Sequence, residues 1–368
     1  MLPDVRSIHS ITEIGRDAWN ACFPGELEDY DYLLAVENAH IKGFEHSYYI
    51  ATENNIMLAG IPAFFTDYDL ATTADGKVRD ILIVLKRVIP LTLKLACVGS
   101  TATESCPVGF HPDCDEHTRI ELFARLLQCF DADTKQRKIN LLACKDFNEA
   151  CKKEFGPLLA TAGYLEVTGM PSAISPITFS SIDAYLTTLS SGTRKDMRRK
   201  LRRKNEIRIE YRSTIDDLIG EVHAMYMETK NRSDTQFEEL TPEYFTGVLR
   251  EMGPQALCTI YYAGETPIGA NLMLVNEERL LDKFFCMRTQ AGQDYNLYFI
   301  SWFANLQYCI DHGLKYYQSG KAGYETKLRL KSEMLANWMY FRHRNWLMDK
   351  MLRLASPLLA FDVPTVKD

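Results

Sequence analysis

The chain has 368 residues, of which 46% are hydrophobic and 25% are charged, and its formal net charge is −7. This composition is that of an ordinary folded protein and excludes a disordered, collagenous or low-complexity chain. At about 100 to 200 residues per domain, the length favours two lobes. The longest apolar stretch, residues 81–98, is interrupted by basic residues and Pro90, so we expect no membrane span. No basic segment followed by an apolar run opens the chain, which favours a cytoplasmic location.

The spacing of cysteine and histidine residues predicts neither a disulfide framework nor a metal site. The ten cysteines are scattered without a C-x-x-C pair, and several lie in apolar stretches, where cysteine acts as a small hydrophobic residue. His111 and His117 are six residues apart in a polar stretch, with no second ligand pair at a recognised spacing. We therefore expect reduced thiols, no bound metal and a polar surface loop around these histidines.

Hydrophobic periodicity in the first half predicts a lobe of mixed helices and strands. Residues 47–66 form two apolar segments around Asn54 and Asn55, a pattern typical of a β-hairpin. Further strands are predicted at 81–84, 93–99, 138–143 and 164–168, helices at 119–130 and 149–162, and a long polar loop at 100–117.

The second half repeats this plan with clearer signals. Thr241 followed by Pro242 predicts a helix N-terminus, because threonine caps helices and proline is favoured at the first helical position. Three apolar segments with short turns predict an antiparallel meander, and the helix and strand after it predict a parallel crossover beside the third strand. The predicted helices are 181–189, 194–204, 215–231 and 297–311, and the predicted strands are 208–211, 257–263, 269–275, 280–287 and 314–318.

A strongly basic segment stands out in this acidic chain. Residues 194–204 read RKDMRRKLRRK and contain eight basic residues and one acidic residue. On a helix, columns of like charge flank a narrow apolar stripe of Met197 and Leu201, and they repel one another. The segment is either a solvated helix face or a binding site for phosphates or an acidic lipid surface.

The order of motifs from Tyr185 onward resembles the Fem-type branch of the GNAT acyltransferases. The chain reads YLTTLSSGTRKDMRRKLRRK, then FEELTPEYFTGVLREMG, then the meander, then YNLYFISWFANLQYCIDHGLKYYQSGKAGYETKLRLK. The resemblance covers residues 180–330, and YYIATENNIMLAGIPAFF with LACVGS resembles the N-terminal lobe of the same branch. It implies an α+β fold of two tandem GNAT-like lobes, each a mixed, mainly antiparallel sheet flanked by helices. The first lobe, residues 1–175, is expected to be degenerate, and the second, residues 176–368, to carry the cleft and end in a C-terminal helix.

The resemblance also implies a reaction, the direct transfer of an acyl group from an activated donor to a small-molecule amine acceptor. The donor is expected to be acyl-CoA or an acyl carrier protein thioester, or alternatively an aminoacyl-tRNA in a peptide-bond-forming transfer. The donor is a cosubstrate, so no permanently bound cofactor is implied. A different class of function is a non-catalytic GNAT-fold protein that binds an anion, RNA or lipid through the basic segment.

Candidate site residues come from the matching motifs and from polar residues in apolar segments. Asp282 lies inside an apolar strand, where a carboxylate needs a partner and suits a general base, unless it faces outward on an alternating strand. The segment GKAGYETK matches the family's G...YK motif, and its lysine suits a phosphate or carboxylate. Tyr298 and Tyr317 are alternatives for the leaving-group acid, or for core packing. The predicted catalytic residues are Asp282, Tyr317 and Tyr324; the predicted donor-binding residues are Arg194, Arg198, Arg202, Arg288, Gly292, Asn296, Lys321 and Lys327; the predicted substrate contacts are Tyr295, Gln318 and Ser319.

Two positions depart from the pattern of the family. The pyrophosphate loop of ordinary GNAT enzymes, Q/R-x-x-G-x-G/A before a helix, is represented by residues 288–293 with the single glycine Gly292. Gln318 stands where many relatives carry the aspartate of their DFG motif, so a carboxylate is missing at that position. These departures weigh against CoA as the donor and give weight to the non-catalytic alternative.

The C-terminal stretch 345–354 is amphipathic, with Leu347, Met351 and Leu354 on one face of a helix. One interpretation is a helix docked on the second lobe. The other is peripheral contact with a membrane surface.

Overall fold

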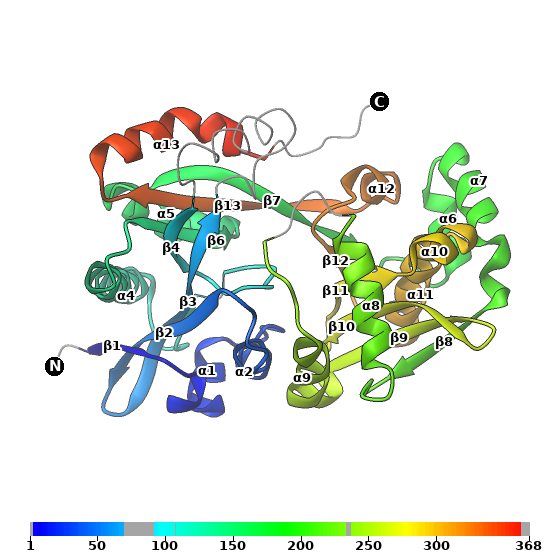
Figure 1. Cartoon of the computed structure of the whole chain (residues 1–368), viewed down its shortest axis with the longest axis horizontal. Helices are drawn as coiled ribbons and strands as arrows, with labels where there is room; N and C mark the ends of the chain where they lie inside the picture. The colour runs from blue at the N-terminus through cyan, green and yellow to red at the C-terminus, as the bar shows by residue number, and fades with distance from the viewer. Residues whose placement is uncertain (1–2, 70–91, 107, 233–236, 362–368) are drawn as a thin grey trace. The chain divides into compact units, whose positions relative to one another are not determined.

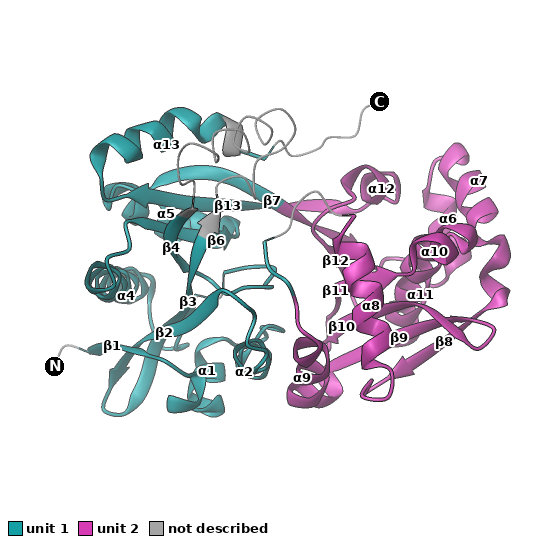
Figure 2. Ribbon diagram, in the orientation of Figure 1, with its two compact units in different colours: residues 1–170, 234–239, 336–362 teal, residues 171–233, 240–335, 363–368 magenta. Residues whose placement is uncertain are grey.

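A computed structural model of the chain describes residues 3–69, 92–106, 108–232 and 237–361. The chain divides into two units (Figures 1 and 2). The division points fall within strands β7 (Leu165–Pro176) and β13 (Glu333–His343), so unit 1 also takes the last strand and helix of the chain. Unit 1 comprises residues 1–170, 234–239 and 336–362, and unit 2 comprises residues 171–233, 240–335 and 363–368.

The sheet of unit 1 has the strand order β1-β2-β3-β4-β6-β13, and the short strand β5 pairs with β3. The predicted hairpin is β2–β3, whose turn residues Asn54 and Asn55 have φ of 50° and 66°, a region that asparagine tolerates. Strands β4 and β6 are parallel because a helix crosses between them. The bounds are β1 Asp4–Ile8, β2 Phe44–Glu53, β3 Ile56–Asp69, β4 Thr92–Val98, β5 Gly109–Phe110 and β6 Leu141–Phe147.

Helices cover both faces of the unit 1 sheet, because successive strand residues point to opposite faces. Tyr49 and Ile61 belong to the core with α4 and α5, whereas Tyr48 and Ile50 pack with α1 and α2. Leu352 packs α13 onto this second face, so the C-terminal helix docks on unit 1 and not on the second lobe. The bounds are α1 Arg16–Cys22, α2 Tyr30–Asn38, α4 Glu116–Gln136, α5 Glu149–Thr161 and α13 Trp346–Leu359.

The sheet of unit 2 continues from the second half of β7 in the order β12-β11-β10-β9-β8. The predicted meander is present, since β10 is antiparallel to both β9 and β11. The predicted crossover is also present, since β12 is parallel to β11. The bounds are β8 Ile207–Arg212, β9 Ala256–Ala263, β10 Thr266–Val275, β11 Arg279–Met287 and β12 Tyr316–Gly320.

Two groups of helices sandwich this sheet. Phe284 of β11 contacts Tyr226 of α8 and Phe245 of α9, with ring centroids 4.9 and 6.1 Å away. Its neighbour Phe285 points to the other face and contacts Tyr298 of α11 at 6.1 Å. The bounds are α6 Ile182–Thr188, α7 Ser191–Lys200, η2 Leu201–Glu206, α8 Ile219–Lys230, α9 Pro242–Met252, η3 Gly253–Gln255, α10 Thr289–Tyr295, α11 Leu297–Asp311 and α12 Tyr324–Arg329.

Most predicted elements are present, with shifted ends. The Oγ1 of Thr241 accepts a hydrogen bond from the N–H of Tyr244 at 3.2 Å, which confirms the predicted helix cap. The predicted loop 100–117 is partly buried, and the predicted strand 81–84 lies outside the described residues. Elements without a clear periodic signal were not predicted: β1, β5, α1, α2, α10, α12 and β13. No helix in the described ranges combines the length and the apolar character that a membrane-spanning helix requires.

The core beneath α11 is expected to determine the stability of unit 2. Leu306 is fully buried in a cluster with Trp302 and Tyr317. We expect Leu306→Ala to lower the free energy of unfolding by about 2 to 5 kcal/mol, because the truncation leaves a cavity. Leu354→Ala, at a position 83% exposed, is the control and is expected to stay within about 0.5 kcal/mol of wild type. Urea unfolding followed by circular dichroism measures the free energy of unfolding of both variants. Equal losses in the two variants would contradict the assignment of Leu306 to the core of unit 2.

Candidate active site

The parallel strands β11 and β12 separate partway along their length. Their pairing ends at Leu281 and Gln318, while β11 continues beside β10 and β12 continues beside β7. Both strands are irregular at this point: the register of β10 with β11 shifts beside Asp282, and the register of β12 with β7 shifts at Ser319. The parallel pair β11 and β12 is therefore splayed. It leaves Asp282 at the point where the strands diverge.

A closed triangle of hydrogen bonds holds Asp282 at this point. The hydroxyl of Tyr317 donates to Oδ2 of Asp282 at 2.9 Å, and Nδ2 of Asn305 donates to the same oxygen at 3.2 Å and to the Tyr317 hydroxyl at 3.0 Å. Asn305 and Tyr317 are buried, whereas Asp282 is half-buried. Burial, and then the negative charge of Asp282, raises the pKa of Tyr317 well above its usual value. Tyr317 therefore keeps its proton and orients the carboxylate.

Further buried polar groups lie on the strand and the helix next to β11. Asn271 is fully buried on β10, and within the described part of the chain neither its side-chain oxygen nor its nitrogen has a hydrogen-bond partner. The same is true of Oδ1 of Asn305 and of the Tyr298 hydroxyl. The pKa of Tyr298 is raised by burial and then by the charge of Asp282, which places the two groups close together. A site rich in unsatisfied polar groups is suited to a polar ligand, because burying such groups without hydrogen-bond partners costs free energy.

The segment after β12 is held in place by its own polar side chains. The ammonium of Lys327 is buried and donates to the carbonyl oxygens of Ser319 at 2.6 Å and Gly320 at 2.9 Å. The Tyr324 hydroxyl donates to the carbonyl of Pro171 at 2.9 Å. Lys327 therefore clamps the loop from inside, and its predicted role in holding a donor phosphate directly does not fit this geometry.

The predicted substrate contacts Gln318 and Ser319 also face β7. Nε2 of Gln318 donates to Oγ of Ser172 at 2.9 Å, and Oγ of Ser319 donates to the carbonyl of Ala173 at 3.4 Å. Both residues are buried, so they fix β12 against its neighbour. Gln318 pairs with Leu281 of the adjacent strand, and Asp282 is the next residue of that strand.

The basic segment forms α7 and continues into η2, and one side of it is neutralised internally. Asp196 pairs with Arg199 at 2.7 Å, Lys200 at 3.5 Å and Arg329 at 3.1 Å. The hydrogen bond from Arg199 lowers the pKa of Asp196, so this carboxylate stays ionised. On the same side, the ammonium of Lys200 lies 3.5 Å from the ring centroid of Phe299.

Arg203, the next basic residue on this side, is also satisfied. Arg203 stacks over the ring of Tyr295 at 3.9 Å and pairs with Glu206 at 2.7 Å. Tyr295, a predicted substrate contact, is thus covered by a guanidinium.

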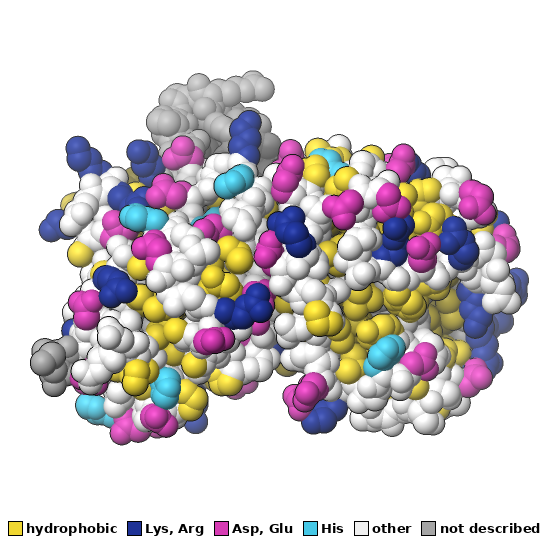
Figure 3. Space-filling view, turned by 90° about the horizontal axis from the view of Figure 1, so that it is seen from below, with side chains coloured by type: hydrophobic (Ala, Val, Ile, Leu, Met, Phe, Trp, Pro, Cys, Tyr) yellow, Lys and Arg dark blue, Asp and Glu magenta, His cyan; other side chains and the backbone are white. Residues whose placement is uncertain are grey.

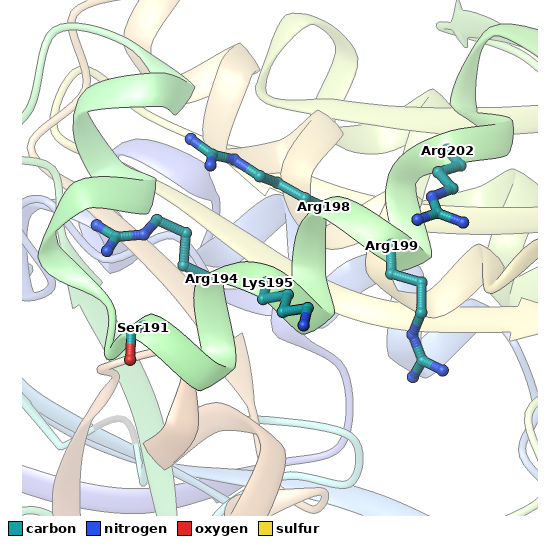
Figure 4. Close-up of a pocket in the computed structure, with 6 residues that line it drawn as sticks. All are labelled: Ser191, Arg194, Lys195, Arg198, Arg199 and Arg202. Carbon is teal, nitrogen blue, oxygen red and sulfur yellow. The ribbon is translucent and has the colours of Figure 1, made fainter.

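The opposite side of α7 and η2 carries uncompensated positive charge. Lys195, Arg198 and Arg202 form no ion pair with any described acidic residue, and Arg194 has only a long hydrogen bond to the Thr187 carbonyl, at 3.5 Å. With Ser191 and Arg199 these four residues line a shallow pocket of about 230 Å³ (Figure 4). Figure 3 shows Lys and Arg side chains gathered at the edge of the unit 2 half. The structure therefore brings together the predicted residues Arg194, Arg198 and Arg202 on one positively charged surface.

The remaining predicted donor-binding residues do not form a phosphate loop. Residues around Gly292 are helical, and the N–H of Gly292 donates to the carbonyl of Arg288 at 2.8 Å. Arg288 pairs with Glu221, and Asn296 joins α10 to α11 with a φ of 54° and no side-chain cap. Lys321 is half-buried in the loop before α12. The prediction that Gly292 offers a backbone N–H to a phosphate is wrong, because that group is used inside the helix.

Unit 1 contains the same strand–helix–strand crossover, but its divergence point is filled. The pairing of β4 with β6 ends at Val98 and Cys144, after which Gly99 turns with a φ of 126°. Lys145 donates to the carbonyl of Ser100 at 3.0 Å and pairs with Asp146 at 2.7 Å. The chain's own loop thus occupies this position, which leaves unit 2 as the unit with an accessible carboxylate.

The comparisons with known proteins agree with this geometry. The chain belongs to the FemAB-like family, described as peptidoglycan biosynthesis and recognition, whose profile matches residues 110–353. No curated protein matches the sequence.

Solved structures show the same fold at low sequence identity. FemX is similar with a TM-score of 0.59 and 10% identity, over 94% of this chain and 99% of that chain. The C-terminal domain of a putative lysylphosphatidylglycerol synthetase from Agrobacterium fabrum is similar with a TM-score of 0.54 and 12% identity, over 93% and 95% of the two chains. A tandem GNAT protein from the clavulanic acid biosynthesis pathway has a TM-score of 0.52 and 10% identity, over 93% and 99%. The fold is therefore a tandem GNAT fold, and the chain is a FemAB-like protein of that fold.

The role of Lys327 as an internal clamp gives a direct test. We expect Lys327→Met to lower the free energy of unfolding by about 1 to 3 kcal/mol, because two buried carbonyls lose a charged donor. The control is Lys315→Met, which removes a surface pair with Glu278 that is 2.6 Å long and contributes less than about 1 kcal/mol. Denaturant unfolding of both variants distinguishes an internal clamp from a ligand-binding lysine. An unchanged free energy of unfolding for Lys327→Met would contradict the clamp and favour a ligand-binding role for Lys327.

Proposed function

We propose that unit 2 transfers an aminoacyl group from aminoacyl-tRNA to an amine acceptor, with the uncompensated face of α7 and η2 binding donor phosphates. The observation that carries this proposal is the charge distribution on the basic segment. Asp196 neutralises one side, while Lys195, Arg198 and Arg202 have no acidic partner among the described residues of a chain whose net charge is −7. Like charges held side by side repel, so an anionic ligand is the natural counterion.

Two features favour tRNA over CoA as the carrier. The single-glycine segment that was compared with a pyrophosphate loop is a helix, in which the N–H of Gly292 donates to the carbonyl of Arg288. The basic face runs from Arg194 to Arg202, a distance of about 12 Å along a helix axis, which suits a run of phosphates. An acyl-CoA or carrier thioester is the second candidate, supported by the splayed strands. Both are cytoplasmic cosubstrates, so a cytoplasmic location remains part of the proposal.

The geometry at the divergence point suggests how the transfer proceeds. The amine nitrogen attacks the donor carbonyl carbon, a new C–N bond forms, and the bond from that carbon to the carrier oxygen or sulfur breaks. Asp282 is placed to receive the proton that the amine loses, since Asn305 and Tyr317 hold its carboxylate by hydrogen bonds of 3.2 and 2.9 Å. Tyr298, whose raised pKa keeps it protonated, is the candidate donor of a proton to the leaving group.

Charge reversal on α7 and η2 tests the binding half of the proposal. We expect the double variant Arg198→Glu and Arg202→Glu to weaken binding of aminoacyl-tRNA at least tenfold at about 100 mM salt and to reduce the slope of log K against log salt by about two. Filter binding across a salt series measures both quantities.

The matched control is Arg250→Glu with Lys315→Glu, which makes the same change in net charge at exposed positions of the same unit. Equal losses for the two double variants would mean that only net charge matters. If neither double variant changes tRNA binding but a thioester stabilises the protein against heat, the thioester candidate replaces aminoacyl-tRNA as the donor.

Asp282→Asn tests the chemical half. The change keeps the shape of the side chain but removes its capacity to accept a proton, so we expect transfer to fall by about 10²- to 10⁴-fold while tRNA affinity is unchanged. Loss of labelled aminoacyl groups from tRNA in the presence of a panel of primary amines measures the rate. Wild-type rates for Asp282→Asn would remove this residue from the reaction, and no transfer by the wild type would favour a non-catalytic binding protein.

A further inference from the structure

The helix α13 displays an apolar surface opposite the side by which it is anchored. Leu352 is 8% exposed and packs against Phe64, Leu95 and Leu141 of the unit 1 sheet. At 100° per residue, the helix directs four other large apolar side chains away from the sheet. These are Trp346, Leu347, Met351 and Leu354, which are 68%, 53%, 55% and 83% exposed.

Such a concentration is uncommon on this molecule. Among the described residues there are eight large hydrophobic side chains that are strongly exposed, and four of them lie on α13. Singly exposed apolar residues are ordinary, but a contiguous apolar surface marks a contact site. Burial in unit 1 does not account for these side chains, because Leu352 is the buried residue that joins that core cluster from the described part of the helix.

Positive charge accompanies the apolar residues on the same surface. Lys350 is exposed between them, and its ammonium lies 5.0 Å from the ring centroid of Trp346. Arg353 is exposed at the edge. The one acidic residue of the helix, Asp349, is turned toward its N-terminus, where it accepts a hydrogen bond from the N–H of His343 at 2.8 Å and pairs with Arg353 at 2.7 Å. The exposed surface is thus apolar and cationic.

We propose that this surface of α13 lies in the head-group layer of an anionic lipid bilayer. The four apolar side chains would enter the boundary with the acyl chains, while Lys350 reaches the lipid phosphates along its aliphatic stem. Tryptophan is favoured at this depth because its ring is amphipathic. A bilayer fits better than a protein partner, since Lys350 stands within the apolar surface and lysine is depleted from the cores of protein interfaces.

The test is flotation of the full chain with vesicles of phosphatidylcholine alone and of phosphatidylcholine with phosphatidylglycerol. We expect binding to the anionic vesicles, at least tenfold weaker in the double variant Leu347→Ser and Leu354→Ser, and about fivefold weaker in Lys350→Gln. Ile56→Ser, which removes a side chain 54% exposed on the β2–β3 hairpin, is the matched control and should bind like wild type.

Tryptophan fluorescence locates the contact. Of the four tryptophans, Trp19 and Trp302 are buried and Trp338 is half-buried with the Lys152 ammonium 4.3 Å from its ring centroid. A blue shift on adding anionic vesicles should therefore come chiefly from Trp346, which is 68% exposed, and disappear in Trp346→Phe. The shift should persist in the variant Arg198→Glu with Arg202→Glu, which separates this surface from the basic face of unit 2. Absence of vesicle binding, binding unchanged in the serine double variant, or loss of the shift only in the α7 variant would each overturn the proposal. A dimer in solution that the serine substitutions dissociate, without vesicle binding, would instead assign the surface to a second copy of the chain.

Discussion

Strand β11 keeps its hydrogen bonds to β10 beyond Leu281 but loses those to β12, and the polar groups that follow must find other partners. Asp282 is the first residue past this point. Tyr317 of β12 and Asn305 of α11 stabilise the carboxylate there by donating hydrogen bonds to it. The separation of the strands and the hydrogen-bonded triangle are therefore two parts of one arrangement: the first makes room beside the sheet, and the second places an ionisable group in it.

The core beneath α11 joins this arrangement to the basic segment. Met197 of α7 packs in the same cluster as Trp302 and Tyr317, so the helix that displays the arginines is anchored to the elements that hold Asp282. Asp196 then decides which of the cations are available, because one carboxylate can satisfy only the neighbours on its own side of the helix. Phosphate binding by the α7 cations and proton acceptance by Asp282 would both depend on the packing of α11. Loss of the core beneath α11 would therefore impair both.

The sequence predicted part of the site because some residues conflict with their local surroundings. Asp282 in an apolar strand and a run of bases in an acidic chain are each visible without a structure. Asn305 was missed, although an asparagine in the middle of the apolar helix LYFISWFANLQYCID was a comparable signal. Lys327 was assigned to a ligand because its motif has glycines and a lysine, but a sequence does not show whether an ammonium meets a ligand or the carbonyls of its own loop. Gly292 was misjudged for a similar reason, since a single glycine occurs in helices as well as in phosphate loops.

Local patterns determined the elements of this protein. The Asn54–Asn55 turn, the Thr241 cap and the period of the meander depend on interactions between residues close in sequence, so the hairpin, the helix start and the antiparallel strands could be predicted from the residues alone. The ordered motifs determined the tandem GNAT fold through their resemblance to a family. Only the tertiary structure decided the rest: that β12 leaves β11 beside Asp282, that the cations of α7 fall into paired and unpaired sides, and that α13 docks on unit 1. Each depends on contacts between residues far apart in the chain, whose free energies no local pattern records.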